Sequence, residues 1–131
     1  MKAYPGVVEA VRALRAEGIR IGVVTSKALI GARRGLAAAG IADAVEAIVS
    51  ADDVVNPKPH REPVDRAVAL LSGDPRATLF VGDSVHDMRS GRAAAVRTGA
   101  ALWGPFRRED LAETEPDHWL ESPMDVVRAA L

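Results

Sequence analysis

The sequence contains no cysteine, so the chain forms no disulfide and no thiolate metal site. Aromatic residues are scarce, at 4% of the chain, although 48% of the residues are hydrophobic. The core is therefore expected to consist mainly of Ala, Val, Leu and Ile. With 131 residues, the chain has the usual size of one domain, and we expect a single core domain over residues 1–131.

The sequence has neither an excess of charge of one sign nor a long apolar run. Its 17 basic and 18 acidic side chains leave a net charge of −1, which argues against nucleic-acid and membrane partners, because basic residues dominate such surfaces. No apolar run approaches the length of a membrane span, and the segment 1–6 lacks the apolar core of a signal peptide. A cytoplasmic protein is the expectation.

Two common catalytic signatures are missing as well. No glycine-rich phosphate loop occurs, and neither Ser26 nor Ser84 lies in a nucleophile elbow. The sequence also shows no internal repeat and no low-complexity tract. It therefore supports neither a P-loop enzyme nor a serine hydrolase.

Apolar runs with strand character alternate with amphipathic helical segments along the chain. Gly18 and Gly40 follow two of the helical segments, in the position where helices often end in a left-handed residue. This alternation with short turns predicts βαβ units, a mainly parallel sheet and a Rossmann-like three-layer αβα fold. The expected helices are 7–17, 28–39, 60–71, 85–95, 107–113 and 124–131, and the expected strands are 19–24, 45–49, 78–82 and 97–103.

The stretch 78–87 carries the strongest pair of polar residues. A short apolar run ends in Gly82, and Asp83 and Asp87 follow, four residues apart. The run is expected to be a buried strand, and ligands bind at the C-terminal edge of such sheets. Two carboxylates in one crevice bind a hard cation, share a proton or repel each other. A structural pair is equally open, with one aspartate in the turn and the other at the helix N-terminus.

Three further polar side chains follow other apolar runs. Thr25 and Ser26 precede a helix, where a hydroxyl and free N–H groups form an anion site, although Ser26 can instead be a simple N-cap. Lys58 lies between two prolines, so a stiff loop presents its ammonium to a phosphate or carboxylate, unless it is a solvated loop lysine. Right-handed crossovers would bring Thr25 and Lys58 to the same sheet edge as the two aspartates.

The order of these motifs is the most specific signal in the sequence. A strand ends in Thr25-Ser26-Lys27, Asn56-Pro57-Lys58-Pro59 precedes a helix, and a further strand ends in Gly82-Asp83-Ser84-Val85-His86-Asp87. This order resembles the haloacid-dehalogenase-like (HAD) hydrolase superfamily, in particular its phosphoglycolate phosphatase and pyrophosphatase-like branch. Tyr4-Pro5-Gly6-Val7 is similar to the segment after the cap domain in that branch, and the segments 101–106 and 116–120 are similar to its C-terminal end.

The resemblance implies a role for each of these residues. Thr25 resembles the residue that hydrogen-bonds the transferring phosphoryl oxygens, and Ser26 adds a backbone N–H. Lys58 resembles the lysine that neutralises phosphate charge and steadies the nucleophile. The implied metal ligands for Mg²⁺ are Asp83, which binds the ion, and Asp87, which holds the ion's water or orients Lys58. These roles suit phosphoryl transfer, which mainly requires positioning and charge neutralisation.

The first motif of the family has no counterpart in this sequence. In the family, a central strand ends in Asp-x-Asp-x-Thr, with the nucleophile as its first aspartate and the general acid/base as its second; Asp52-Asp53 lies in a different loop and is no substitute. A cap domain has no counterpart either. We therefore expect a HAD-like core without its first central strand, and a gap closed by direct pairing of the flanking strands, by a partner chain or by rearrangement.

Two functions are compatible with this pattern. The first is a HAD-like phosphatase core, that is, a Mg²⁺-dependent phosphomonoester hydrolase that is inactive as this chain because the nucleophilic aspartate is absent. The alternative is a non-catalytic pseudo-phosphatase or partner-binding module. The expected ligand is a phosphorylated small molecule, and the strand gap favours a homo-oligomer or a complementing chain.

Overall fold

The computed structural model describes residues 5–131, and Met1–Tyr4, where the expected N-terminal turn begins, lie outside the described residues. The helices are α1 (Val7–Ala16), α2 (Leu29–Ala39), α3 (Glu62–Leu70), α4 (Val85–Ala93), α5 (Arg108–Leu111) and α6 (Met124–Ala130). The strands are β1 (Gly22–Val24), β2 (Ala47–Val49), β3 (Leu79–Gly82), β4 (Arg97–Ala101) and β5 (His118–Leu120). Helices and strands alternate, which confirms the α/β class.

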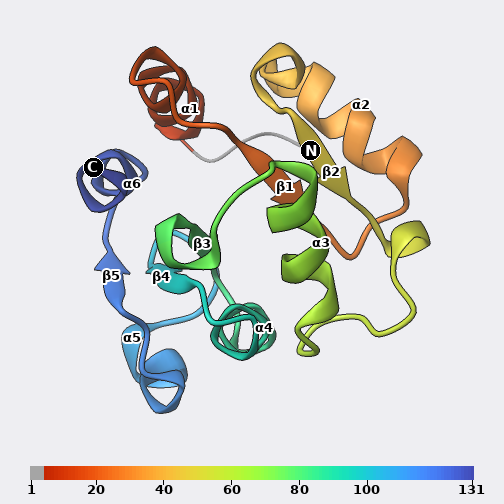
Figure 1. The fold of residues 1–131 in the computed structure, drawn as a ribbon. Coiled ribbons are helices and arrows are strands. Elements are labelled where there is room, and N and C mark those ends of the chain that lie inside the picture. The colour runs from red at the N-terminus through yellow and green to blue at the C-terminus, as the bar shows by residue number, and fades with distance from the viewer. Residues whose placement is uncertain (1–4) are drawn as a thin grey trace.

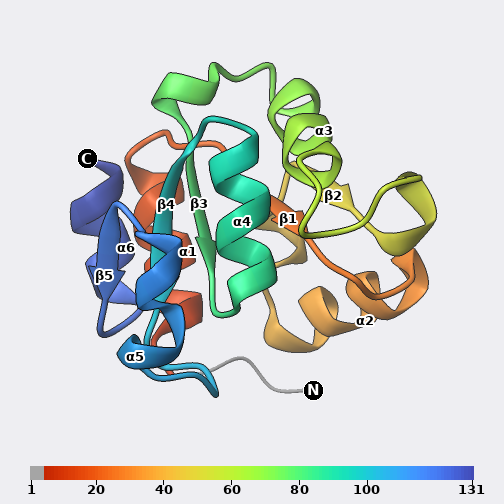
Figure 2. The same cartoon turned by 90° about the horizontal axis from the view of Figure 1, so that it is seen from below.

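All strand pairs are parallel, and they form two separate sheets. β1 pairs with β2, with Val23 opposite Ile48, while β3, β4 and β5 form a second sheet with Val81 opposite Gly99. Helices α3 and α4 cover one side of the strands, and α1 and α6 cover the other (Figures 1 and 2). The fold is therefore the Rossmann-like αβα arrangement that the sequence predicts, divided within its sheet layer.

The predicted boundaries hold better for helices than for strands. Gly18 and Gly40 have φ of 78° and 76°, as expected for left-handed residues that end α1 and α2. The strand predicted at 19–24 is limited to Gly22–Val24. The strand β5 lies in a segment for which the sequence predicts no strand, since three residues that pair only with β4 are too short for a periodic pattern.

The core is aliphatic, as the low aromatic content predicts. One cluster joins α3 to the segment after α4, and a second joins α4, β4 and α5. The buried members are Val64, Val68, Ala94 and Val96 in the first cluster and Met88, Ala100 and Leu111 in the second. These contacts place α4, and the motif at its N-terminus, firmly on the second sheet.

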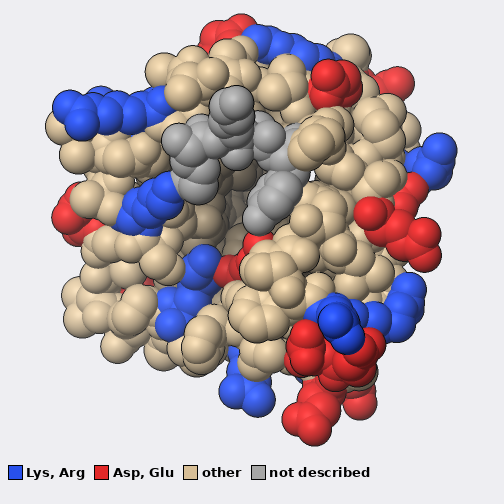
Figure 3. All heavy atoms as spheres, turned by 180° about the vertical axis from the view of Figure 1, so that it is seen from behind, with Lys and Arg blue, Asp and Glu red and all other residues tan. Residues whose placement is uncertain are grey.

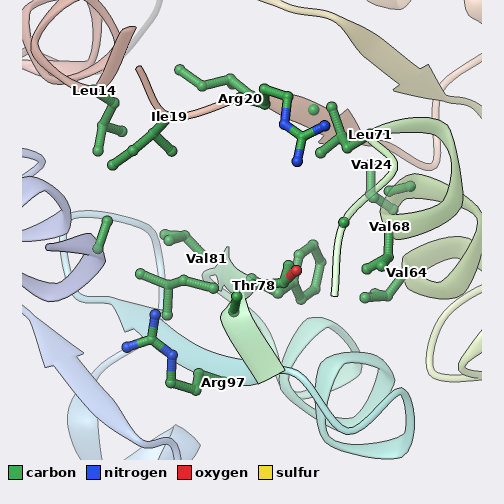
Figure 4. A pocket seen from close by; sticks show the side chains of 18 of the residues that line it. Leu14, Ile19, Arg20, Val24, Val64, Val68, Leu71, Thr78, Val81 and Arg97 are labelled. Carbon is green, nitrogen blue, oxygen red and sulfur yellow. The ribbon is translucent and has the colours of Figure 1, made fainter. Parts of the chain in front are cut away.

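The strands β1 and β3 border a cavity of about 560 Å³ and do not pair with each other. Every residue of both strands is only half-buried. The expectation of a buried strand at 78–82 is therefore wrong, because one edge of β3 faces the cavity. Of the three predicted ways of closing the gap, direct pairing and rearrangement do not occur in the described residues, and closure by a partner chain stays a prediction. The cavity walls are mostly apolar, with Arg20 and Arg97 on opposite sides of it, as Figure 4 shows.

Packing between helices explains why the two sheets remain apart. Helix α1, which leads into β1, packs on α6, which follows β5. On the opposite side of the strands, α3 packs on α4 and also contacts β1 and β2. The gap is therefore bridged on both sides by helix pairs, which keep the edges of β1 and β3 at their separation.

The surface carries charges of both signs. Figure 3 shows basic and acidic side chains scattered over this face, without one sign covering it. None of the helices in residues 5–131 is long and apolar enough to span a bilayer.

Two glycines inside α2 provide a test of this helix. An added Cβ at Gly31 or Gly35 would meet no atom within 4 Å. Because glycine weakens helix interiors, we expect Gly31→Ala and Gly35→Ala each to raise the free energy of unfolding by about 0.5–1 kcal/mol in urea titrations. The control is Gly40→Ala, which should lower it, since Gly40 has a φ of 76°. A loss of stability in both helix variants would contradict the assignment of α2.

Candidate active site

Asp83 and Asp87 lie at the C-terminal end of β3, in the turn that leads into α4. Ser84 is the N-cap of α4, and its Oγ accepts a hydrogen bond from the Asp87 backbone N–H at 3.1 Å. The Asp87 carboxylate turns back over the turn, and its Oδ2 accepts from the Asp83 N–H at 3.1 Å. The turn is thus closed from both ends, and Asp87 is only 7% exposed.

Lys58 contacts the same carboxylate. Its Nζ lies 2.6 Å from Oδ1 of Asp87, and the two side chains are only 16% and 10% exposed. Both oxygens of Asp87 therefore have hydrogen-bond partners, Lys58 on one and the Asp83 N–H on the other. This contact across 29 residues is the one that the parallel topology predicts for the two loops.

The environment of Asp83 opposes its ionisation. Burial, followed by the negative charge of Asp87 and a hydrogen bond with it, raises the pKa of the Asp83 carboxyl above its ordinary value, while Lys58 acts weakly in the opposite direction. A cation beside Asp83 would relieve this unfavourable environment. A carboxylate whose ionised form is disfavoured unless a cation lies beside it is typical of a metal ligand.

Two glycines allow the backbone to approach these aspartates. An added Cβ at Gly82 would lie 2.3 Å from the Asp87 Cβ, and one at Gly104 would lie 2.7 Å from the Asp83 Cβ. Real Cβ atoms do not come this close, so both positions require glycine. That Gly104 lies beside the aspartates was not predicted from the sequence. The Gly-Pro pair just after the strand-like run 97–103 is the sequence signal that could have indicated a turn there.

Thr25 and Ser26 lie at the end of β1, in the other sheet. The Thr25 N–H donates to the Val49 carbonyl at 2.9 Å, and its Oγ1 accepts from the Lys27 N–H at 3.1 Å. Within residues 5–131, no hydrogen bond joins Thr25 or Ser26 to Lys58 or to the two aspartates. The structure thus brings three of the five predicted residues into contact and leaves two at the end of the neighbouring sheet.

The interpretation of Ser26 as an N-cap is wrong. Helix α2 begins at Leu29, its N-cap position is Ala28, and the Leu29 N–H donates to the carboxylate of Asp52 at 3.0 Å. Asp53 accepts from the backbone N–H and the hydroxyl of Ser50. The Asp52-Asp53 pair therefore holds the loop after β2 and the start of α2, which sequence separation concealed.

Asp83 and Asp87 supply two carboxylates, which is enough for Mg²⁺ only if waters and substrate provide the other ligands. Within the described part of the chain, no cluster of three or more His, Cys, Asp or Glu side chains could hold a metal. Mg²⁺, however, usually binds through one or two carboxylates together with waters and substrate phosphates. Asp83, with Asp87 beside it, satisfies that smaller requirement.

Because the pKa of Asp83 is raised, the amount by which this side chain lowers the free energy of unfolding depends on pH. Between the ordinary pKa and the raised one, the folded state keeps a proton that the unfolded state has lost, so stability falls as pH rises through this window. Asp83→Asn does not titrate and should be as stable as the original chain at acid pH and more stable at pH 7, in urea titrations without metal. Asp43→Asn should show the opposite sign, since Arg12 lowers the pKa of Asp43. A pH-independent effect of Asp83→Asn would contradict the prediction.

Comparison with known proteins identifies the family of this chain. Residues 1–101 match the family described as haloacid dehalogenase-like hydrolase. Pyrophosphatase PpaX from Anoxybacillus flavithermus is 35% identical over 127 residues, which cover 97% of this chain and 59% of that protein. The chain therefore spans little more than half the length of the curated relatives it matches.

Solved structures share the whole observed fold. A "predicted phosphoglycolate phosphatase" from Haemophilus somnus superimposes with a TM-score of 0.89 at 26% identity, over 98% of this chain and 57% of that one. A HAD-superfamily hydrolase of subfamily IA from Geobacter sulfurreducens gives 0.82 at 26% identity, over 97% and 55%. With its motifs, its fold and its matched residues in agreement, the chain belongs to the haloacid dehalogenase-like hydrolase family.

Proposed function

We propose that this chain forms the larger part of the catalytic core of a Mg²⁺-dependent phosphomonoester hydrolase. The observation that carries the proposal is the cavity between β1 and β3, which lies beside the strand that ends at Gly82, one residue before Asp83. A strand parallel to both neighbours would fill the gap and pair with both free edges. If it bears the nucleophilic aspartate, its carboxylate arrives next to Asp83 and Lys58.

Each residue of the site has a task in this proposal. The Lys58 ammonium, held by Asp87, neutralises charge on the transferring phosphoryl oxygens, and Thr25 donates a hydroxyl hydrogen bond to them. Asp83 is the carboxylate that holds Mg²⁺, with Asp87 beside it. When bound, Mg²⁺ neutralises further charge on the phosphoryl group. The substrate class is a phosphorylated small molecule, and the names of the relatives suggest two probes: phosphoglycolate, a phosphomonoester, and pyrophosphate, a phosphoanhydride whose hydrolysis requires the same phosphoryl transfer.

A chimera tests the proposal directly. The part of the A. flavithermus pyrophosphatase that precedes its matched region is joined to residue 1 of this chain, and phosphate release is measured with Mg²⁺. The 131-residue chain alone is expected to show no turnover, and the chimera is expected to hydrolyse at least one probe. Lys58→Met in the chimera should lower kcat by about 100-fold or more, the usual effect of losing a group that stabilises developing charge.

The control variant is Asp65→Asn on α3, whose partner is the exposed Arg61, and it should leave turnover unchanged. A folded chimera without turnover would refute the proposal and favour the non-catalytic module. Hydrolysis by the 131-residue chain alone, lost in Asp83→Asn, would refute the expected inactivity.

A further inference from the structure

Ser90 makes a hydrogen bond that is unusual for a serine inside a helix. Such serines commonly donate to the carbonyl four residues earlier, which here belongs to His86. The Oγ of Ser90 instead donates to the backbone carbonyl of His60, 30 residues away, at 2.5 Å. Ser90 is fully buried, and its hydroxyl joins α4 to the loop that contains Lys58.

The position of Ser90 on α4 is also informative. It follows Asp87 by three residues, so both side chains lie on one face of the helix. This face contacts the loop at two points: Asp87 binds the Lys58 ammonium at 2.6 Å, and Ser90 binds the backbone two residues further on. The helix thus holds both the charged end of Lys58 and the main chain that carries it.

The opposite end of the same loop is held from α3. The Glu62 carboxylate accepts from the backbone N–H groups of Val55 and Asn56, at 3.0 and 3.1 Å. Lys58 therefore lies between two anchored segments, one held by Glu62 and the other by Ser90. Because a lysine has four rotatable side-chain bonds, a fixed backbone is what limits where its ammonium can be.

We propose that Ser90 is a positioning residue, which sets the place of the Lys58 ammonium by tying the His60 carbonyl to α4. Its importance for catalysis rests on the proposed function, in which Lys58 neutralises phosphoryl charge. The hydrogen bond from Ser90 to the His60 carbonyl, called the tether below, can be tested without any measurement of turnover. Without it, the loop keeps its anchor at Glu62 and its ion pair, but the backbone after Lys58 moves more freely and the ammonium leaves Asp87 more often.

Lysine labelling of the 131-residue chain tests the tether. The sequence has three lysines, Lys2, Lys27 and Lys58, so a limiting amine-reactive reagent followed by mass spectrometry gives the rate at Lys58 relative to Lys27. We expect Ser90→Ala to raise this relative rate about fivefold, the effect of losing one hydrogen bond. The matched control is Thr114→Val, which removes another buried hydroxyl, one that donates to the Leu111 carbonyl at 2.6 Å, and it should leave the rate unchanged.

An unchanged rate in folded Ser90→Ala, or an equal rise in Thr114→Val, would overturn the proposal. If alanine at this position prevents folding, Ser90→Cys keeps the volume, offers a weaker donor and should raise the rate less. In the chimera, Ser90→Ala should lower kcat by about fivefold with little change in KM, since it displaces a group needed in the transition state. A labelling response without any turnover of the chimera would leave the tether standing and refute only the hydrolase.

Discussion

Replacing Asp87 with alanine is expected to lower the free energy of unfolding by about 3 kcal/mol. The substitution leaves the largely buried ammonium of Lys58 without its partner and the Asp83 N–H without its acceptor. Removing one member of a shielded ion pair costs more than the pair contributes, because the remaining charge stays out of water. Urea titrations at pH 7 measure the change.

An exposed pair supplies the control for this experiment. Asp65→Ala breaks the ion pair with Arg61 on α3, whose side chains are 39% and 56% exposed, and it should cost less than about 1 kcal/mol. The double variant Lys58→Met with Asp87→Ala should recover part of the loss, since no unpaired charge remains. Equal losses in Asp87→Ala and Asp65→Ala would show that the Lys58 pair is not shielded in solution.

Gly82→Ala is expected to destabilise the fold by at least about 3 kcal/mol. Its new Cβ would lie 2.3 Å from the Cβ and 2.7 Å from the Cγ of Asp87. The Asp87 Cβ is attached to the first turn of α4, so no side-chain rotation relieves the overlap, and the turn itself must shift. Thermal and urea unfolding should both report the loss, and the hydrogen bond from the Asp83 N–H to Asp87 should be lost with it.

The matched control is Gly99→Ala in the neighbouring strand β4. There the new Cβ would come within 2.6 Å of Cδ1 of Leu120, the far end of a side chain that can change rotamer, so a cost of about 1 kcal/mol is expected. A milder effect at Gly82 than at Gly99 would mean that the turn before α4 is more adaptable than its geometry indicates.

Some contacts of the site can be predicted from the sequence, and others cannot. Lys58 comes after β2 and Asp87 after β3, in different sheets, and their contact is the one that right-handed crossovers predict. The bonds made by Asp52 and Ser90 join segments 23 and 30 residues apart. They have no local signature, because a capping carboxylate or a helix serine looks the same in sequence whatever it contacts.

The order of the helices and of strands β1 to β4, the aliphatic core and the aspartates after Gly82 are set by local pattern, and the amino-acid sequence by itself determines them. Periodicity and turn residues act over a few positions, so for these elements the local pattern was sufficient, whereas β5 forms only by pairing with β4. The open gap between β1 and β3 was decided only by the tertiary structure. Whether two strands pair depends on how far apart their helices hold them, and here α1 on α6 and α3 on α4 keep both edges free.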